Sequence, residues 1–139
     1  PEPNFSSCFG APFMSQKPAV YAELLAKRMA ENNTRCILLN TGWSGGPYGT
    51  GDRMSLKATR ALLNAALNGD FDDVELLTEP TLGVKMPTTC PGVDDAILNP
   101  RNTWDNPEAY DDAAASLRDM FRANFEKQNY AALGISPAM

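Results

Sequence analysis

The chain is 139 residues long, close to the commonest size of one domain, and 43% of its residues are hydrophobic, which is ordinary for a globular protein. Its 12 basic and 17 acidic residues give a net charge of −5, which provides no long-range attraction to nucleic acid or to anionic lipid but leaves small anions open as ligands. No apolar run approaches the ~20 residues that a membrane-spanning helix needs.

The first third of the chain has the pattern of half an α/β unit. Residues 1–16 predict an extended entry, and a helix is expected to start near Pro18, because proline is favoured at the first helical position, and to stop at Asn32. The apolar stripe of this helix consists of Tyr21, Leu24, Leu25 and Met29. The continuous apolar run at residues 36–39 then predicts a strand buried on both faces.

A glycine-rich loop follows at residues 40–53, and a second helix is predicted from about Leu56 to Asn68. Ser55 is its expected N-cap and Gly69 its stop. We expect the buried side of this helix to consist of Leu56, Leu63 and Leu67. Apolar residues alternate at residues 82–86, which predicts a half-buried strand.

Residues 87–104 show little periodicity and predict a long segment that follows the surface. The last helix is expected to start at Pro107, with Asp105 or Asn106 as its cap, and to end near Gln128. Its apolar stripe consists of Tyr110, Ala114, Leu117, Phe121 and Phe125. These elements predict an α/β chain with about three main helices packed on a few strands, as a single partial domain over residues 1–139.

The glycine-rich loop before the second helix is the main candidate for a functional site. Glycines let backbone N–H groups approach an anion, and a helix N-terminus carries roughly half a positive charge. Gly46 and Gly51 have the spacing of a triphosphate-binding loop, but Asp52 and Arg53 follow them in place of Lys and Ser or Thr. An acid at that place repels phosphate, so we expect the loop to lie beside the base or ribose of a nucleotide.

Arg53, Ser55 and Thr59 have two interpretations. Ser55 and Thr59 are four residues apart and share one helix face, directly after Arg53. A guanidinium can stack on adenine while a hydroxyl one turn away reads the edge of the ring. In the other interpretation Arg53 pairs with a surface carboxylate, Ser55 only caps the helix and Thr59 has no role in binding.

Other residue types give weaker signals. The chain has no histidine, the commonest general base and transition-metal ligand, and its three cysteines form no CxxC pair, which argues against structural zinc or disulfides and suits a reducing cytosol. The acidic clusters lack the spacing of a calcium loop and are expected to be solvated. Trp43 and Tyr48 are either ligand-stacking rings or loop anchors, and Phe9 and Phe13 either fill the core or line a pocket.

Five segments occur in register along the chain, namely residues 3–13, 40–43, 53–60, 91–93 and 98–104. The series resembles the C-terminal part of the ATP-dependent phosphoenolpyruvate carboxykinases, and it extends from near Pro1 to about Phe125. The resemblance implies a C-terminal fragment of a mixed α/β nucleotide-binding domain. It also implies a cytoplasmic enzyme of gluconeogenesis that converts oxaloacetate and ATP to phosphoenolpyruvate, ADP and carbon dioxide with magnesium and manganese.

Carried over residue by residue, the resemblance implies that Arg53, the backbone of Met54 and Thr59 contact the adenine of ATP. Phe13 corresponds to an aromatic that lines the carbon dioxide and oxaloacetate pocket. The family's phosphate-binding loop, metal-binding Lys, His and Asp, and substrate arginine belong upstream of Pro1, so the chain is expected to hold no catalytic residue and no metal ligand. The loop at residues 44–52 resembles the longer form that some members carry, and Asp52 stands where a basic or neutral residue is frequent.

The chain begins without an initiator Met, and we therefore expect a piece of a longer enzyme that is inactive alone and packs on the missing N-terminal part. Two alternatives remain at this stage. The chain is either a separate module that binds adenine nucleotides without chemistry, or an inert structural fragment whose apolar surface packs on a parent domain.

Overall fold

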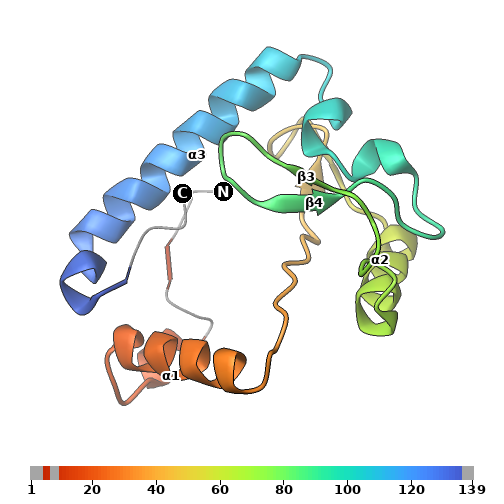
Figure 1. Cartoon of the computed structure of the whole chain (residues 1–139). Coiled ribbons are helices and arrows are strands. Elements are labelled where there is room, and N and C mark those ends of the chain that lie inside the picture. The colour runs from red at the N-terminus through yellow and green to blue at the C-terminus, as the bar shows by residue number, and fades with distance from the viewer. Residues whose placement is uncertain (1–4, 7–9, 136–139) are drawn as a thin grey trace. The chain divides into compact units, whose positions relative to one another are not determined.

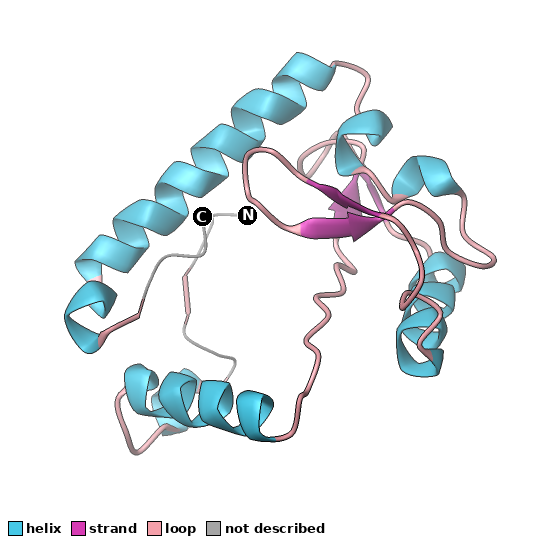
Figure 2. Cartoon of the chain, in the orientation of Figure 1, coloured by secondary structure: helices cyan, strands magenta, loops and turns pink. Residues whose placement is uncertain are grey.

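The computed structural model describes residues 5–6 and 10–135. In these residues the chain is a mixed α/β fragment with three α-helices and two antiparallel two-stranded sheets (Figures 1 and 2). The helices are α1 (Pro18–Glu31), α2 (Leu56–Asn68) and α3 (Pro107–Lys127). Strand β1 (Trp43–Ser44) pairs with β2 (Asp52–Arg53), and β3 (Leu76–Thr78) pairs with β4 (Lys85–Pro87). The chain divides into two compact units, one of residues 37–119 and one that combines the N-terminal residues with those from 120 onward.

Helix α1 has the bounds that its sequence predicts. It begins at Pro18 and ends at Glu31, and the side-chain amide of the C-cap Asn32 donates a hydrogen bond of 2.8 Å to the carbonyl of Arg28. No residue of α1 is buried, and its apolar side chains are 38–61% exposed from Val20 to Leu25. Within the described residues no side chain of its apolar stripe is therefore buried.

The strand predicted at residues 36–39 is wrong for the described structure. These residues lie outside any sheet, and Ile37, Leu38 and Leu39 are 47%, 83% and 37% exposed. A strand that is buried on both faces needs neighbouring strands and covering layers. The described residues supply neither to this segment, and residues 37–39 make no backbone hydrogen bond within them.

Helix α2 confirms both of its predicted ends but not its predicted buried side. The hydroxyl of Ser55 accepts a hydrogen bond of 3.1 Å from the Ala58 amide, and Gly69 takes a left-handed conformation with φ +80°. The buried residues are Leu62 and Ala65, which pack with Cys90, whereas Leu56, Leu63 and Leu67 are 72%, 45% and 76% exposed. Apolar residues lie on two sides of this helix, and the contact with the segment around Cys90 decides which side is covered.

The second hairpin is organised by a buried acid. Glu79 is 3% exposed, and its carboxylate accepts hydrogen bonds from the amides of Thr81 and Leu82. These bonds form a turn, so β4 begins at Lys85 and covers only the last part of the strand predicted at residues 82–86. Burial and the neighbouring Glu79 raise the pKa of the Tyr110 phenol. The Glu79 carboxylate in the turn therefore acts electrostatically on the Tyr110 phenol at the start of α3.

The segment before α3 is irregular, as predicted, but short 3-10 turns give it order. One of them covers Pro100–Thr103 and is capped by Asn99. The guanidinium of Arg101 donates two hydrogen bonds, of 2.8 and 2.9 Å, to the carboxylate of Asp111. Helix α3 starts at Pro107, as predicted, and buries Tyr110 and Ala114. Of the two candidate caps, Asn106 accepts the hydrogen bond from the Glu108 amide. Within the described residues no helix is long and apolar enough to cross a membrane.

Candidate functional site

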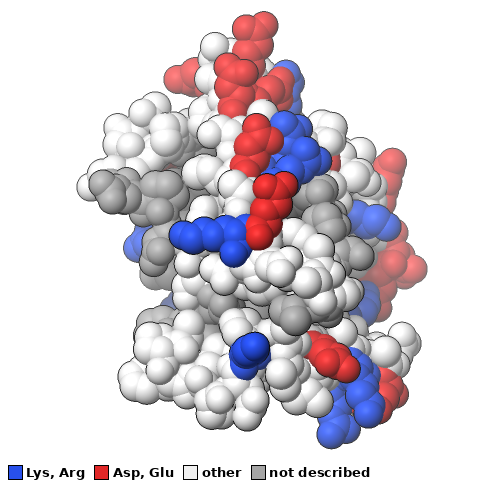
Figure 3. All heavy atoms as spheres, turned by 90° about the vertical axis from the view of Figure 1, so that its left-hand side faces the viewer, with Lys and Arg blue, Asp and Glu red and all other residues white. Residues whose placement is uncertain are grey.

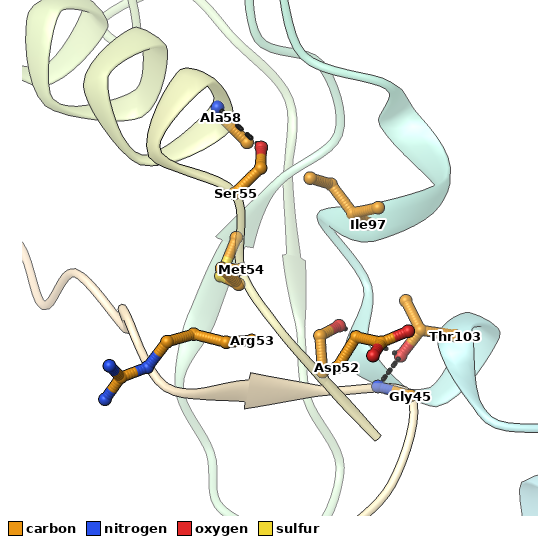
Figure 4. Close-up of a pocket in the computed structure, with 9 residues that line it drawn as sticks. Gly45, Asp52, Arg53, Met54, Ser55, Ala58, Ile97 and Thr103 are labelled. Carbon is orange, nitrogen blue, oxygen red and sulfur yellow. Dashed lines mark hydrogen bonds between the residues drawn. The ribbon is translucent and has the colours of Figure 1, made fainter. Parts of the chain in front are cut away.

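A cavity of about 340 Å³ lies where the glycine-rich hairpin meets the start of α2 (Figure 4). Small-molecule sites typically measure about 300–1,000 Å³, so this cavity is at the lower end of that range. Its lining residues all belong to the unit of residues 37–119. They are Ser44, Gly45, Asp52, Arg53, Met54, Ser55, Ala58, Ile97 and Thr103.

The hairpin that forms one wall depends on a close approach at Gly51. Strands β1 and β2 pair Trp43 with Arg53 and Ser44 with Asp52. A Cβ atom at Gly51 would lie 2.5 Å from the carbonyl oxygens of both Ser44 and Gly46, so a side chain there requires the backbone to move. The rings of Trp43 and Tyr48 meet edge to face at 5.2 Å, and both are more than 40% exposed.

Met54 and Ser55 connect this hairpin to α2. The Met54 amide donates a hydrogen bond of 2.9 Å to the carbonyl of Gly42, which holds the connection against the other end of the hairpin. The Ser55 hydroxyl caps α2, which confirms its predicted role as the N-cap of this helix. The positive end of the α2 dipole therefore lies at the cavity.

Asp52 and Arg53 send their side chains in opposite directions, as successive residues of a strand do. Figure 4 shows the Asp52 carboxylate on the side of Gly45 and Thr103, and the Arg53 guanidinium extending away from both. Arg53 is exposed, and within the described residues no carboxylate forms an ion pair with it. In the described part of the chain the guanidinium therefore has no ion-pair partner, and it lies on the opposite side of the hairpin from the Asp52 carboxylate.

Two predicted site residues lie outside the cavity lining. Thr59 is half-buried on α2, next to Ala58, which does line the cavity. Phe13 ends a short 3-10 turn (Ala11–Phe13) and is 91% exposed, so it does not fill the core. Phe13 belongs to the other unit, and Phe9 lies outside the described residues.

Comparison with known proteins gives a consistent result. The family profile described as phosphoenolpyruvate carboxykinase matches residues 1–96. A phosphoenolpyruvate carboxykinase (ATP) of Pelobacter propionicus is 49% identical over 100% of this chain and 26% of its own length. Proteins of the same description from Flavobacterium johnsoniae and Moorella thermoacetica are 53% and 55% identical over 91% of this chain and 24% of their own.

The chain belongs to the ATP-dependent phosphoenolpyruvate carboxykinase family. It spans about a quarter of the length of these relatives and corresponds to their C-terminal part. The resemblance found in the sequence motifs is thereby confirmed at the level of the family.

The described residues offer no site for the magnesium and manganese ions that the resemblance implies for the whole enzyme. Among the described residues, no three His, Cys, Asp or Glu side chains gather where they could hold an ion. Asp52 is the one carboxylate in the described cavity lining. No chemical step of the carboxykinase reaction is therefore derived from a metal bound to this chain.

Sequence reasoning missed five residues that the carboxykinase fragment brings to its cavity: Ser44, Gly45, Ala58, Ile97 and Thr103. Ser44 and Gly45 lie in the glycine-rich loop, which the sequence did single out. Thr103 lies in one of the five matching segments, at residues 98–104, but no periodic pattern links it to a loop 58 residues earlier. Only the folded chain shows that contact.

Proposed function

We propose that this chain contributes the adenine side of the ATP pocket in an ATP-dependent phosphoenolpyruvate carboxykinase. The whole enzyme would convert oxaloacetate and ATP to phosphoenolpyruvate, ADP and carbon dioxide, as a cytoplasmic step of gluconeogenesis. The single observation that carries the proposal is the cavity that joins Arg53 and Met54 to the N-terminus of α2, in a chain of this family.

The chemistry of the lining suits a flat heteroaromatic ring. Met54, Ala58 and Ile97 supply apolar contact, while Ser44 and Ser55 supply hydroxyl groups. The backbone of Met54 would hydrogen-bond the edge of the base, and the exposed Arg53 guanidinium would stack on its face. Thr59 follows Ala58 of the cavity lining, and its hydroxyl would hydrogen-bond the same base when ATP covers this face of α2.

The position of Asp52 explains why the triphosphate would be held elsewhere. Its carboxylate faces the cavity beside Gly45 and Thr103, on the side opposite to the Arg53 guanidinium (Figure 4). A negative charge there repels phosphate, and in this hairpin no lysine takes its place. Phosphate and the magnesium and manganese ions would therefore bind to parts of the enzyme that the relatives have and this chain does not include.

The remaining roles follow from the same proposal. Phe13 would line the pocket for carbon dioxide and oxaloacetate, for which its 91% exposure leaves the ring accessible. The chain would form a single partial domain over residues 1–139 that packs on the N-terminal part of the enzyme. It would be inactive alone, because it carries no histidine and no described cluster of metal ligands.

The test is Arg53→Ala in the full-length enzyme. We expect the apparent KM for ATP to rise by an amount equivalent to about 1–3 kcal/mol, the scale of a charge-assisted contact, with a smaller effect on the KM for oxaloacetate. Arg60→Ala is the matched control, because Arg60 is an exposed arginine of α2 that does not line the cavity. An unchanged KM for ATP in Arg53→Ala would exclude the adenine role.

Calorimetry of the isolated chain with ATP separates this proposal from a self-sufficient nucleotide-binding module. One edge of a pocket provides few contacts, so we expect weak binding or none. Tight binding by residues 1–139 alone would instead favour the module.

A further inference from the structure

We propose that Thr103 is a positioning residue for the nucleotide, because its hydroxyl fixes the glycine-rich hairpin as a wall of the cavity. This inference rests on the proposed adenine site and assigns to it a residue that lies 58 positions beyond the loop it holds. Thr103 acts through Ser44 and Gly45, and it is not a catalytic residue.

The hydrogen bonds of the Thr103 hydroxyl use its full capacity. A hydroxyl has one proton to donate and two lone pairs to accept with. The proton is directed to the carbonyl of Pro100 at 2.7 Å. The lone pairs accept from the Gly45 amide at 3.0 Å and from the Ser44 hydroxyl at 3.3 Å. Because the proton is bound within the 3-10 turn, both acceptor positions are directed at the hairpin.

The backbone approaches closely at the same place. Gly45 has φ +78°, and a Cβ atom there would lie 3.1 Å from the carbonyl oxygen of Thr103. A side chain at Gly45 would thus be strained by its conformation and crowded by Thr103. The absence of a side chain at Gly45 therefore lets its amide reach the Thr103 hydroxyl.

The turn that carries Thr103 is itself ordered by hydrogen bonds. Thr103 ends the 3-10 turn Pro100–Thr103, and the side chain of Asn99 caps this turn through the Arg101 amide at 3.2 Å. Arg101 in turn makes two hydrogen bonds to Asp111 at the start of α3. Residues 42–51 contain five glycines, and such a loop loses much conformational entropy when it is ordered. The Thr103 hydroxyl connects this loop to an ordered turn and helix.

The two walls of the cavity depend on this anchor to different degrees. Arg53 and Met54 lead directly into α2, and the Met54 amide is bound to Gly42. Within the described residues, the Ser44–Gly45 wall is held to the rest of its unit by Thr103 and by the short pairing with β2. Loss of the hydroxyl should therefore loosen the wall and weaken nucleotide binding, and leave the chemical step unchanged.

The experiment uses the full-length enzyme with Thr103→Val, which keeps the branched shape and removes the hydroxyl, and Thr103→Ser, which keeps the hydroxyl. We expect the valine variant to raise the Kd and KM for ATP about five- to tenfold, the effect of one or two hydrogen bonds, with kcat and the KM for oxaloacetate within about twofold. The serine variant should restore ATP binding to within about twofold of the parent enzyme. Amide hydrogen exchange at Gly45 should be faster in the valine variant, because that amide loses its acceptor.

Three results would overturn the inference. One is an unchanged Kd for ATP in Thr103→Val while Arg53→Ala still weakens ATP binding. The proposed adenine site would then remain supported, but without a role for Thr103. Another is an equal loss in the valine and serine variants, and a third is a parallel fall in kcat and in affinity for both substrates. If neither Thr103→Val nor Arg53→Ala affects ATP, the proposed function fails as well. If the valine variant does not fold, Thr103→Ala replaces it with the same expected split.

Discussion

The ion pair between Arg101 and Asp111 is the clearest case in which single side chains set a local property. The two hydrogen bonds from the guanidinium, of 2.8 and 2.9 Å, stabilise the charged carboxylate and hold the pKa of Asp111 below its usual range. Both side chains are more than 40% exposed, so solvent screens the pair and its effect on stability is small. Its importance is geometric, because it fixes the turn that carries Thr103.

The pH dependence of this pair has a definite sign. A carboxylate whose pKa is lower in the folded than in the unfolded chain stabilises the fold above its unfolded pKa, about 3.9, and loses that contribution as the pH falls through the folded value. We expect carboxyl NMR titration to place the pKa of Asp111 below the usual range and Arg101→Gln to return it there. Arg118→Gln, which breaks the pair with Asp119, is the control and should leave Asp111 unchanged. A normal Asp111 titration in the parent protein would contradict the pairing.

Helix α2 shows how one element depends on its ends. Ser55 caps it through the Ala58 amide, Gly69 ends it with φ +80°, and its middle buries Leu62 and Ala65. The sequence predicts both ends correctly because capping is a local interaction. It predicts the wrong buried side because leucines lie on both sides of the helix, and periodicity does not show that Leu62 is covered while the other three leucines stay exposed.

Removal of the cap should loosen the first turn of α2. Ser55→Ala deletes the oxygen that accepts from Ala58, and such changes cost about 0.5–2 kcal/mol. We expect native-state hydrogen exchange to show that loss of local stability at the amides of the first turn, with little change in α3. Ser55→Asp keeps an oxygen acceptor and should retain most of the stability. Equal exchange in Ser55→Ala and the parent protein would show that the cap is not required.

For the whole molecule, the main feature is apolar surface without cover. Leu38 is 83% exposed in an extended segment, and no residue of α1 is buried. On the face shown in Figure 3, basic and acidic side chains are interspersed. The ion pairs of the described residues include Lys27–Glu31 and Arg118–Asp119. The chain spans about a quarter of the length of its relatives, so further polypeptide of the enzyme is the proposed cover for the apolar segment.

Hydrogen exchange tests this arrangement directly. In the isolated chain the amides of residues 37–39 should exchange rapidly, because they make no hydrogen bond within the described residues. In the full-length enzyme we expect the same amides to be protected at least about tenfold, because the covering polypeptide would shield them from water. The capped turn at Ala58 is the internal control and should be similar in both proteins. Equally fast exchange of residues 37–39 in the full-length enzyme would contradict the proposed cover.

The sequence by itself determined the three helices, the cap at Ser55, and the family, because these depend on neighbouring residues and on motifs in a fixed order. It left Asp105 and Asn106 as alternative caps of α3, and the structure selects Asn106. It did not determine the buried side of α2, the absence of a strand at residues 36–39, or the turn at Glu79 that shortens β4. The contact of Thr103 with Gly45 was also decided by the tertiary structure alone. Burial and long-range hydrogen bonds depend on which segments meet in space, and local periodicity contains no information on that choice.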